Sequence, residues 1–92
     1  MEITEKAILI VDDEKNIREL VKFNLESRGY KVIEAADGEE ALNLVKTYPP
    51  LLIILDLMLP KIDGLEVCRI LKGNPLTKKI PIIMLTALGD EI

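Results

Sequence analysis

The sequence contains no histidine, and this absence excludes several kinds of active site. A Ser-His-Asp triad, a histidine-ligated zinc ion and an imidazole general base all need that residue. The chain also has a single cysteine, Cys68, so an internal disulfide is excluded and a reducing compartment is favoured. Histidine-based catalysis and a disulfide-stapled fold are therefore both ruled out.

Long apolar runs and an excess of basic residues are missing as well. The longest apolar runs are the five-residue segments 7–11 and 51–55, which are far too short to span a membrane. The first residues contain no basic region followed by a long apolar stretch, so we expect no signal peptide and a cytoplasmic location. The net charge of −4 disfavours direct binding to nucleic acid or to an anionic membrane.

The composition and the apolar pattern are typical of one small α/β domain. Of the 92 residues, 49% are apolar and 30% are charged, which indicates a globular chain, and we expect residues 1–92 to form a single domain. Short runs of leucine and β-branched residues predict strands that are buried on both faces, as in a parallel sheet. The strands are expected at residues 7–11, 31–35, 51–55 and 80–85.

Helical patterns lie between these strands. Residues 14–28 carry apolar side chains at helical spacing, and Gly29 follows them as a terminator. The inward stripe of this helix is expected to be Ile17, Leu20, Val21 and Leu25. Asp37 followed by Glu40 predicts the capped start of a second helix, which ends before Pro49. Its inward face is expected to be Ala41, Leu42, Val45 and Tyr48.

A third helix is expected at residues 64–72, with Val67, Cys68 and Leu71 pointing inward. The predicted order is therefore β-α-β-α-β-α-β. Strands that alternate with helices in this way indicate an α/β fold with a parallel sheet and right-handed crossovers.

Polar side chains follow three of the predicted strands directly. Asp12 and Asp13 come after the first strand, Asp56 after the third and Thr86 after the fourth. Ligands of an open parallel sheet bind beyond the carboxyl ends of its strands, so these residues are expected to share one crevice. At a separation of about 4 Å and an effective dielectric near 20, each pair of like charges costs roughly 4 kcal/mol. Such a cluster needs a cation or a proton.

Oxygen ligands with no cysteine or histidine nearby favour a hard divalent cation, which we expect to be Mg²⁺. The expected ligands are Asp12, Asp13, Asp56 and the backbone carbonyl of Met58. Because Mg²⁺ recruits phosphate oxygens, a phosphoryl group is its expected companion. Asp56, at the end of the innermost strand, is the candidate nucleophile that would form an aspartyl phosphate, and the Thr86 hydroxyl is a candidate donor to the phosphoryl group.

Several segments of the chain resemble the receiver domain of two-component response regulators. They are residues 9–14 (LIVDDE), 37–38 (DG) before 41–42 (AL), 56–60 (DLMLP), 63–64 (DG) and 85–87 (LTA). The resemblance implies the flavodoxin-like strand order 2-1-3-4-5. It also implies that Asp56 accepts a phosphoryl group from a phosphohistidine on a sensor histidine kinase. Mg²⁺ would be held by Asp12 or Asp13, Asp56 and the Met58 carbonyl, and Thr86 would be the switch hydroxyl.

The sequence departs from this family after the fourth predicted strand. The family continues with a fifth strand, which carries a lysine that contacts the phosphoryl group, and with a fifth helix. We therefore expect the strand order 2-1-3-4, with the fifth strand and fifth helix absent and the domain incomplete at its C-terminus. An exposed edge at residues 80–85 favours self-association of the chain. Phe23 is expected to be exposed, or buried in a partner chain.

Three functions remain open at this point. We favour a phosphoacceptor signalling domain over an enzyme, with at most self-phosphorylation and self-dephosphorylation. A Mg²⁺-dependent phosphohydrolase on such a fold needs an acid two residues after its nucleophile, where this chain has Met58. The alternative is a receiver fragment that cannot be phosphorylated and that self-associates through its fourth strand.

Overall fold

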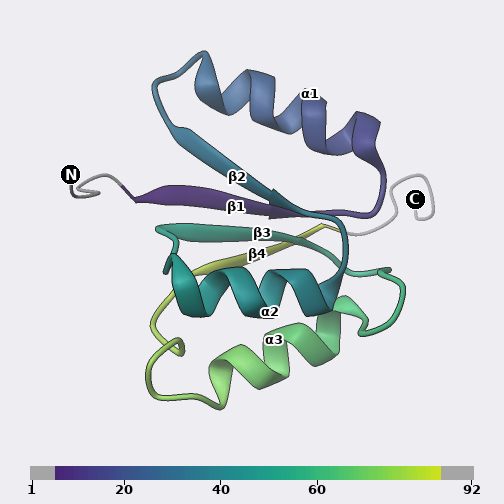
Figure 1. Cartoon of the computed structure of the whole chain (residues 1–92), viewed down its shortest axis with the longest axis vertical. Coiled ribbons are helices and arrows are strands. Elements are labelled where there is room, and N and C mark those ends of the chain that lie inside the picture. The colour runs from purple at the N-terminus through teal and green to yellow at the C-terminus, as the bar shows by residue number, and fades with distance from the viewer. Residues whose placement is uncertain (1–5, 86–92) are drawn as a thin grey trace.

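The computed structural model describes residues 6–85 of the chain. Strands and helices alternate along this range, as the sequence predicts (Figure 1). The elements are β1 (Ala7–Val11), α1 (Lys15–Glu26), β2 (Lys31–Ala35), α2 (Gly38–Thr47), β3 (Leu52–Asp56), α3 (Gly64–Lys72) and β4 (Ile82–Leu85). None of the helices in this range combines the length and the apolar character that crossing a membrane requires.

The strands form one parallel sheet in the order β2-β1-β3-β4, which confirms the predicted arrangement of these strands. The two central strands, β1 and β3, are paired so that Val11 lies beside Leu55. On the other side of β3, Asp56 pairs with Leu85 of β4. This register brings the carboxyl ends of β1 and β3 level with each other at one edge of the sheet.

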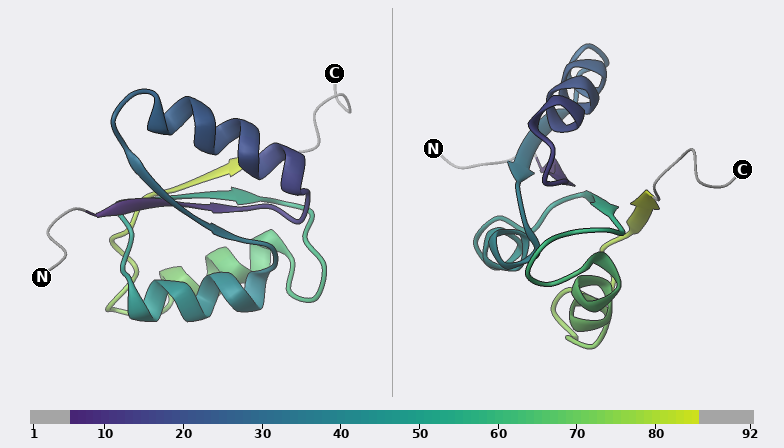
Figure 2. Two further views of the ribbon diagram at one scale, coloured as in Figure 1. Left: turned by 45° about the horizontal axis from the view of Figure 1, so that its top comes forward. Right: turned by 90° about the vertical axis from the view of Figure 1, so that its right-hand side faces the viewer.

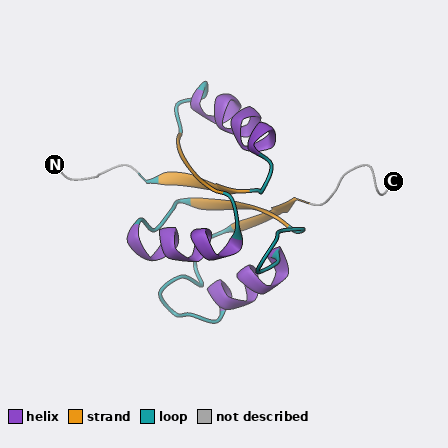
Figure 3. Ribbon diagram, turned by 45° about the vertical axis from the view of Figure 1, so that its right-hand side comes forward, coloured by secondary structure: helices purple, strands orange, loops and turns teal. Residues whose placement is uncertain are grey.

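The helices cover the two faces of the sheet unequally. α1 lies on one face, while α2 and α3 pack together on the other (Figures 1 and 2). The strands therefore lie between two helical layers (Figure 3). The main apolar core includes Leu9 and Val11 of β1 together with residues of α2 and α3. Because side chains alternate along a strand, Ile8 and Ile10 point to the face of α1, and they are buried too. Thus β1 is buried on both faces, as its apolar run predicts.

Side-chain caps begin α2 and α3. Asp37 Oδ1 accepts a hydrogen bond from the backbone N–H of Glu40 at 2.8 Å, and Glu40 Oε1 accepts one from the N–H of Ala36 at 2.8 Å. The cap by Asp37 is therefore confirmed, whereas Glu40 binds the N–H of the residue before the cap and not that of Asp37 itself, as a capping box would require. Asp63 caps α3 by accepting a hydrogen bond from the N–H of Glu66 at 3.0 Å. Both caps fix where the chain leaves the carboxyl edge of the sheet.

Two residues predicted to point inward, Tyr48 and Leu20, are exposed instead. Tyr48 is exposed because α2 ends at Thr47 and Tyr48 leaves the helical conformation, with φ −131° and ψ 82°. Leu20 is exposed because α1 is the single helix on its face among residues 6–85, and none of its residues is fully buried. The observed helix α1, at Lys15–Glu26, is also shorter than the helix predicted at 14–28. Gly29 lies after the end of this helix and has a positive φ of 95°.

The strand β4 lies at the edge of the sheet. It begins at Ile82 rather than at residue 80, and no second strand among residues 6–85 pairs with its outer side. Ile83 is half-exposed, and Phe23 of α1 is exposed. The expected exposure of Phe23 is therefore confirmed within this part of the chain. Self-association through β4 stays a prediction.

Gly64, the first residue of α3, lies directly against the end of β3. A Cβ atom at this position would lie 2.3 Å from the carbonyl oxygen of Asp56 and 2.8 Å from the Cα of Leu57. The backbone N–H of Gly64 also donates a hydrogen bond to the Leu57 carbonyl at 3.0 Å. A glycine is therefore required here, because any side chain would displace the backbone that carries Asp56.

We expect Gly64→Ala to lower the free energy of unfolding by about 3 kcal/mol, because the added methyl group overlaps backbone atoms that cannot turn away. Urea unfolding would measure this change. Gly73→Ala is the matched control, since Gly73 has a negative φ of −85° and a Cβ there would meet its nearest atom at 3.2 Å. We expect that control to change the stability by less than about 1 kcal/mol. Equal stability of Gly64→Ala and wild type would contradict the close approach.

Candidate metal centre

The acidic residues of the predicted site lie at the carboxyl edge of the sheet, between its two central strands. Asp12 follows β1 directly, and Asp56 is the last residue of β3. Since Val11 pairs with Leu55, the next residue on each strand lies level with its neighbour. The chain leaves β1 towards β2 on one side and leaves β3 towards β4 on the other. This is the position at which open parallel sheets bind ligands.

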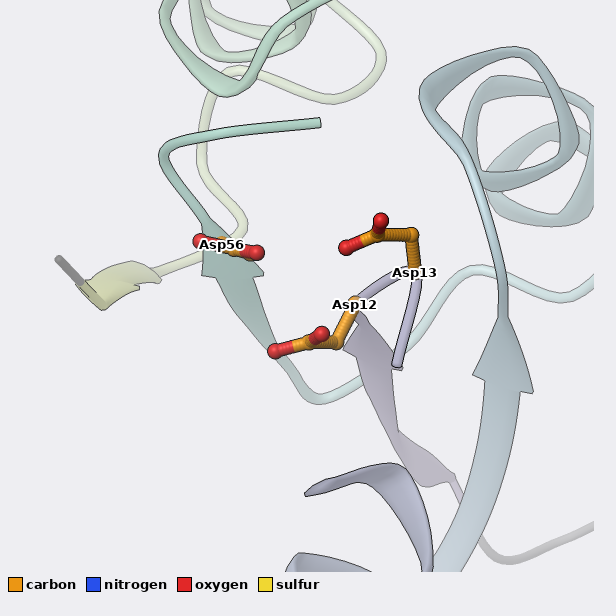
Figure 4. Close-up of side chains that lie close together, drawn as sticks. All are labelled: Asp12, Asp13 and Asp56. Atoms are coloured by element: carbon orange, nitrogen blue, oxygen red, sulfur yellow. The ribbon is translucent and has the colours of Figure 1, made fainter. Parts of the chain in front are cut away.

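The side chains of Asp12, Asp13 and Asp56 form one cluster. Each offers a carboxylate oxygen, and these oxygens all lie within 4.8 Å of one another. In Figure 4 the carboxylate of Asp13 extends from the loop after β1 towards the end of β3, where Asp56 lies. Asp12 is buried, Asp56 is partly buried and Asp13 is exposed. The cluster is thus closed on the side of the sheet and open on the side of Asp13.

The surroundings of Asp56 raise the pKa of its carboxyl group. The largest cause is burial, which disfavours the charged form, and the negative charges of Asp12, Asp13 and Glu14 act in the same direction. A hydrogen bond from the backbone N–H of Met58 acts against them. A cation placed among these carboxylates would favour the charged form of Asp56 and so oppose both of the effects that raise its pKa.

Hydrogen bonds occupy one oxygen of each of the two strand-end carboxylates. Asp56 Oδ1 accepts a hydrogen bond from the Met58 N–H at 3.1 Å, and Asp12 Oδ1 accepts one from the Glu14 N–H at 2.9 Å. Among residues 6–85, the second oxygen of each carboxylate accepts no hydrogen bond from the protein. Clustered oxygen donors with a free atom on each side chain fit a hard cation such as Mg²⁺.

A groove of about 540 Å³ adjoins the cluster at Asp13. Its other lining residues are Leu57, Met58, Leu59, Pro60, Asp63 and Leu65. Both Met58 and Leu65 are exposed. The loop after β3 therefore places an apolar surface beside the acidic residues.

The structure brings together three of the predicted site residues, Asp12, Asp13 and Asp56. Met58 lies beside them through its backbone, and the metal-binding role of its carbonyl stays a prediction. Thr86 lies outside the described residues. Sequence reasoning missed Arg18 of α1, which donates a hydrogen bond to the backbone carbonyl of Asp12 at 2.9 Å. A basic residue next to the apolar stripe of α1 was the one available signal.

Comparisons with known proteins agree on one family. The model of the response regulator receiver domain matches residues 8–92. The chain is 55% identical over 86 residues to the alkaline phosphatase synthesis transcriptional regulatory protein PhoP of Bacillus subtilis, covering 94% of this chain and 35% of that protein. It is 52% identical over 90 residues to the probable transcriptional regulator ycf27 of Cyanophora paradoxa, covering 98% and 36%. The chain thus spans about a third of the length of these relatives.

Solved structures give the same result. A putative response regulator from Chloroflexus aurantiacus superposes with a TM-score of 0.89 at 43% identity, covering 96% of this chain and 72% of that one. The response regulator TrrA of Thermotoga maritima, solved in complex with Mg²⁺-BeF, superposes with a TM-score of 0.83 at 45% identity, covering 91% and 71%. The flavodoxin-like fold is therefore confirmed for the part of the chain that the structure describes.

We expect Asp56→Asn to raise the thermal midpoint of the metal-free protein at pH 7 by up to about 4 °C. The raised pKa of Asp56 means that its charged form destabilises the folded state, so stability falls as the pH rises through the titration of this group. Asparagine keeps the oxygen that accepts the Met58 N–H but carries no charge. The measurement is a thermal melt as a function of pH.

The difference between Asp56→Asn and wild type should vanish at a pH at which Asp56 is protonated, because both side chains are then neutral. Glu26→Gln is the control, since Glu26 is an exposed carboxylate in the last turn of α1, away from the cluster. A pH-independent effect of Asp56→Asn would show that the charge of Asp56 in these surroundings is not its cause.

Proposed function

The chain belongs to the response regulator receiver domain family, and on that premise we propose that Asp56 is its phosphoacceptor. The donor would be a phosphohistidine on a sensor histidine kinase. The phosphoryl group would be taken up with Mg²⁺ bound at the cluster of Asp12, Asp13 and Asp56. The convergence of these carboxylates at the ends of the two central strands is the observation that carries the proposal.

The residues available to hold the metal are Asp12, Asp13, Asp56 and the carbonyl of Met58. When bound, the ion would offset the charge of the incoming phosphoryl group. The choice of Mg²⁺ is supported by the donor set, which consists of oxygen atoms alone. It is also supported by the likeness to the Thermotoga maritima regulator solved with Mg²⁺-BeF.

Asp56 would act as an oxygen nucleophile. The bond from the Met58 N–H fixes Oδ1 and leaves the other carboxylate oxygen to attack phosphorus. That oxygen would form the new bond to phosphorus as the bond to the histidine nitrogen breaks. We further propose that Thr86, from its place in the family pattern, is the switch hydroxyl that turns towards the new phosphate.

The partner of this reaction would dock beside the acceptor. Exposed Met58 and Leu65 line the apolar groove next to Asp13, and an apolar groove supports contact with another protein. The transcriptional roles in the names of the relatives concern proteins about three times as long as this chain. We propose no direct contact with nucleic acid for residues 1–92, whose net charge is −4.

A second function has support of its own. The outer side of β4 is unpaired among residues 6–85, and Ile83 is half-exposed there. An apolar strand edge of this kind favours pairing with another chain. The alternative proposal is therefore a self-associating receiver unit that does not take up phosphate.

We expect the protein to gain the mass of one phosphoryl group when it is incubated with Mg²⁺ and acetyl phosphate. Intact-mass spectrometry would measure the gain. It should be absent without Mg²⁺ and absent in Asp56→Asn. Asp63→Asn is the matched control, because Asp63 lies on the same loop and asparagine preserves the cap of α3. Equal labelling of Asp56→Asn and wild type would exclude Asp56 as the acceptor.

We expect Ile83→Lys to shift the protein towards the monomer if the chain associates through β4, because a charged side chain on an edge strand opposes pairing. Light scattering over a range of concentrations would measure the mass. Leu76→Lys is the control, since Leu76 is exposed on the loop before β4 and not on the strand. A wild-type protein that stays monomeric at all concentrations would contradict the alternative function.

A further inference from the structure

Arg18 connects α1 to strand β2 and to Asp12, the residue that follows β1. Its Nε donates a hydrogen bond to Glu34 Oε1 of β2 at 3.0 Å, and its Nη1 donates one to the backbone carbonyl of Asp12 at 2.9 Å. The side chain is 15% exposed, which is unusually low for an arginine on a surface helix. The planar guanidinium can hold both partners at once because its donors have fixed directions.

The contact from Arg18 completes a set of bonds that immobilise Asp12. The N–H of Asp12 donates to the Ala35 carbonyl at 3.1 Å, which extends the pairing of β1 and β2 by one residue. The side-chain Oδ1 accepts from the Glu14 N–H, and the carbonyl accepts from Arg18. Asp12 is only 6% exposed, and among residues 6–85 Arg18 is the one donor to its carbonyl, so removal of Arg18 would leave that carbonyl without a protein partner.

The carbonyl of Asp12 belongs to the peptide plane that leads into Asp13. An arginine that fixes this carbonyl therefore fixes the plane from which both residues extend. A rotation of that plane would move the carboxylates of Asp12 and Asp13 relative to Asp56. Small displacements matter in a metal site, because ligand atoms must meet at one point.

Glu34 holds Arg18 in place from the opposite side. Its Oε1 accepts from Arg18, and its Oε2 lies 3.4 Å from Nζ of Lys22. Lys22 therefore contacts the same carboxylate as Arg18, and it makes no hydrogen bond to Asp12 among the described residues. Lys22 is also more exposed than Arg18, at 37% against 15%, and it serves as the comparison because it shares the carboxylate of Glu34.

We propose that Arg18 is a positioning residue of the metal centre, acting through the backbone carbonyl of Asp12, and that Glu34 orients it. This inference rests on the proposed function, in which Mg²⁺ binds at Asp12, Asp13 and Asp56. Arg18 would favour Mg²⁺ binding by fixing the position of the ligands, although its positive charge opposes the binding of a cation. A cation beside the site repels Mg²⁺, so charge alone would make removal of Arg18 tighten metal binding. Loss of positioning has the opposite sign and weakens binding.

The test is calorimetric titration of the full chain with Mg²⁺ alone, comparing wild type, Arg18→Met and Lys22→Met. Methionine keeps most of the apolar stem in each case. We expect Arg18→Met to weaken Mg²⁺ binding about tenfold, as is typical when a group that orients a ligand is removed. We expect Lys22→Met to leave binding unchanged or slightly tighter. Binding by Arg18→Met that equals or exceeds wild type would overturn the inference.

A second variant, Arg18→Lys, keeps the charge but replaces the two nitrogens that reach Glu34 and Asp12 with a single one. It should also weaken binding several-fold, and it decides the question if Arg18→Met does not fold. In the metal-free protein, the amide resonances of Asp12 and Asp13 should shift in both Arg18 variants and stay in place in Lys22→Met. Unchanged resonances in both Arg18 variants would exclude positioning.

The outcomes separate this inference from the proposed function. A wild-type protein that binds no Mg²⁺ would refute the metal centre itself, and the role of Arg18 would be refuted with it. A wild-type protein that binds Mg²⁺, with Arg18 variants that bind equally well, would refute the role of Arg18 alone.

Discussion

The site depends on one constraint, which is the fixed register of two parallel strands: β3 ends in Asp56, and Asp12 directly follows the end of β1. Pairing of Val11 with Leu55 leaves Asp12 and Asp56 level and one strand spacing apart. The apolar run of β1 behind Asp12 is buried on both faces of the sheet, so a slip that moved Asp12 into this run would bury a carboxylate among apolar side chains. Hydrophobic packing therefore forces like charges together, and the resulting repulsion makes the site receptive to a cation.

Much of this arrangement could be predicted from the sequence. The strands and helices followed from apolar runs, caps and terminators, and the meeting of Asp12 with Asp56 followed from the rule that parallel strands share a carboxyl edge. The order of the strands came from the family resemblance, because local patterns do not specify which strands are neighbours. The family assignment, supported along residues 8–92, agrees with that order.

What the sequence left undetermined depends on tertiary packing. Helical spacing placed Leu20 and Tyr48 on the apolar stripes of two helices, but it could not show that α1 lies alone on its face of the sheet or that α2 ends before Tyr48. Arg18 was missed for a related reason. Its partners lie 6 and 16 residues away along the chain, and no local rule connects positions at those separations. A charged residue next to an apolar stripe is usually solvated. The role of Arg18 can be recognised only from the tertiary structure, in which its helix packs beside β2.

The helix α1 contains no fully buried residue, although its Arg18 holds the backbone of Asp12, the most buried acid among residues 6–85. A helix without a fully buried residue is expected to open locally at a free energy below that of global unfolding. Each such opening would release the Asp12 carbonyl, so a bound cation would favour the closed state of the helix. Occupancy of the site and hydrogen-exchange protection of α1 would then be thermodynamically linked. Binding of a cation at the edge of the sheet would raise the protection of amides along this helix.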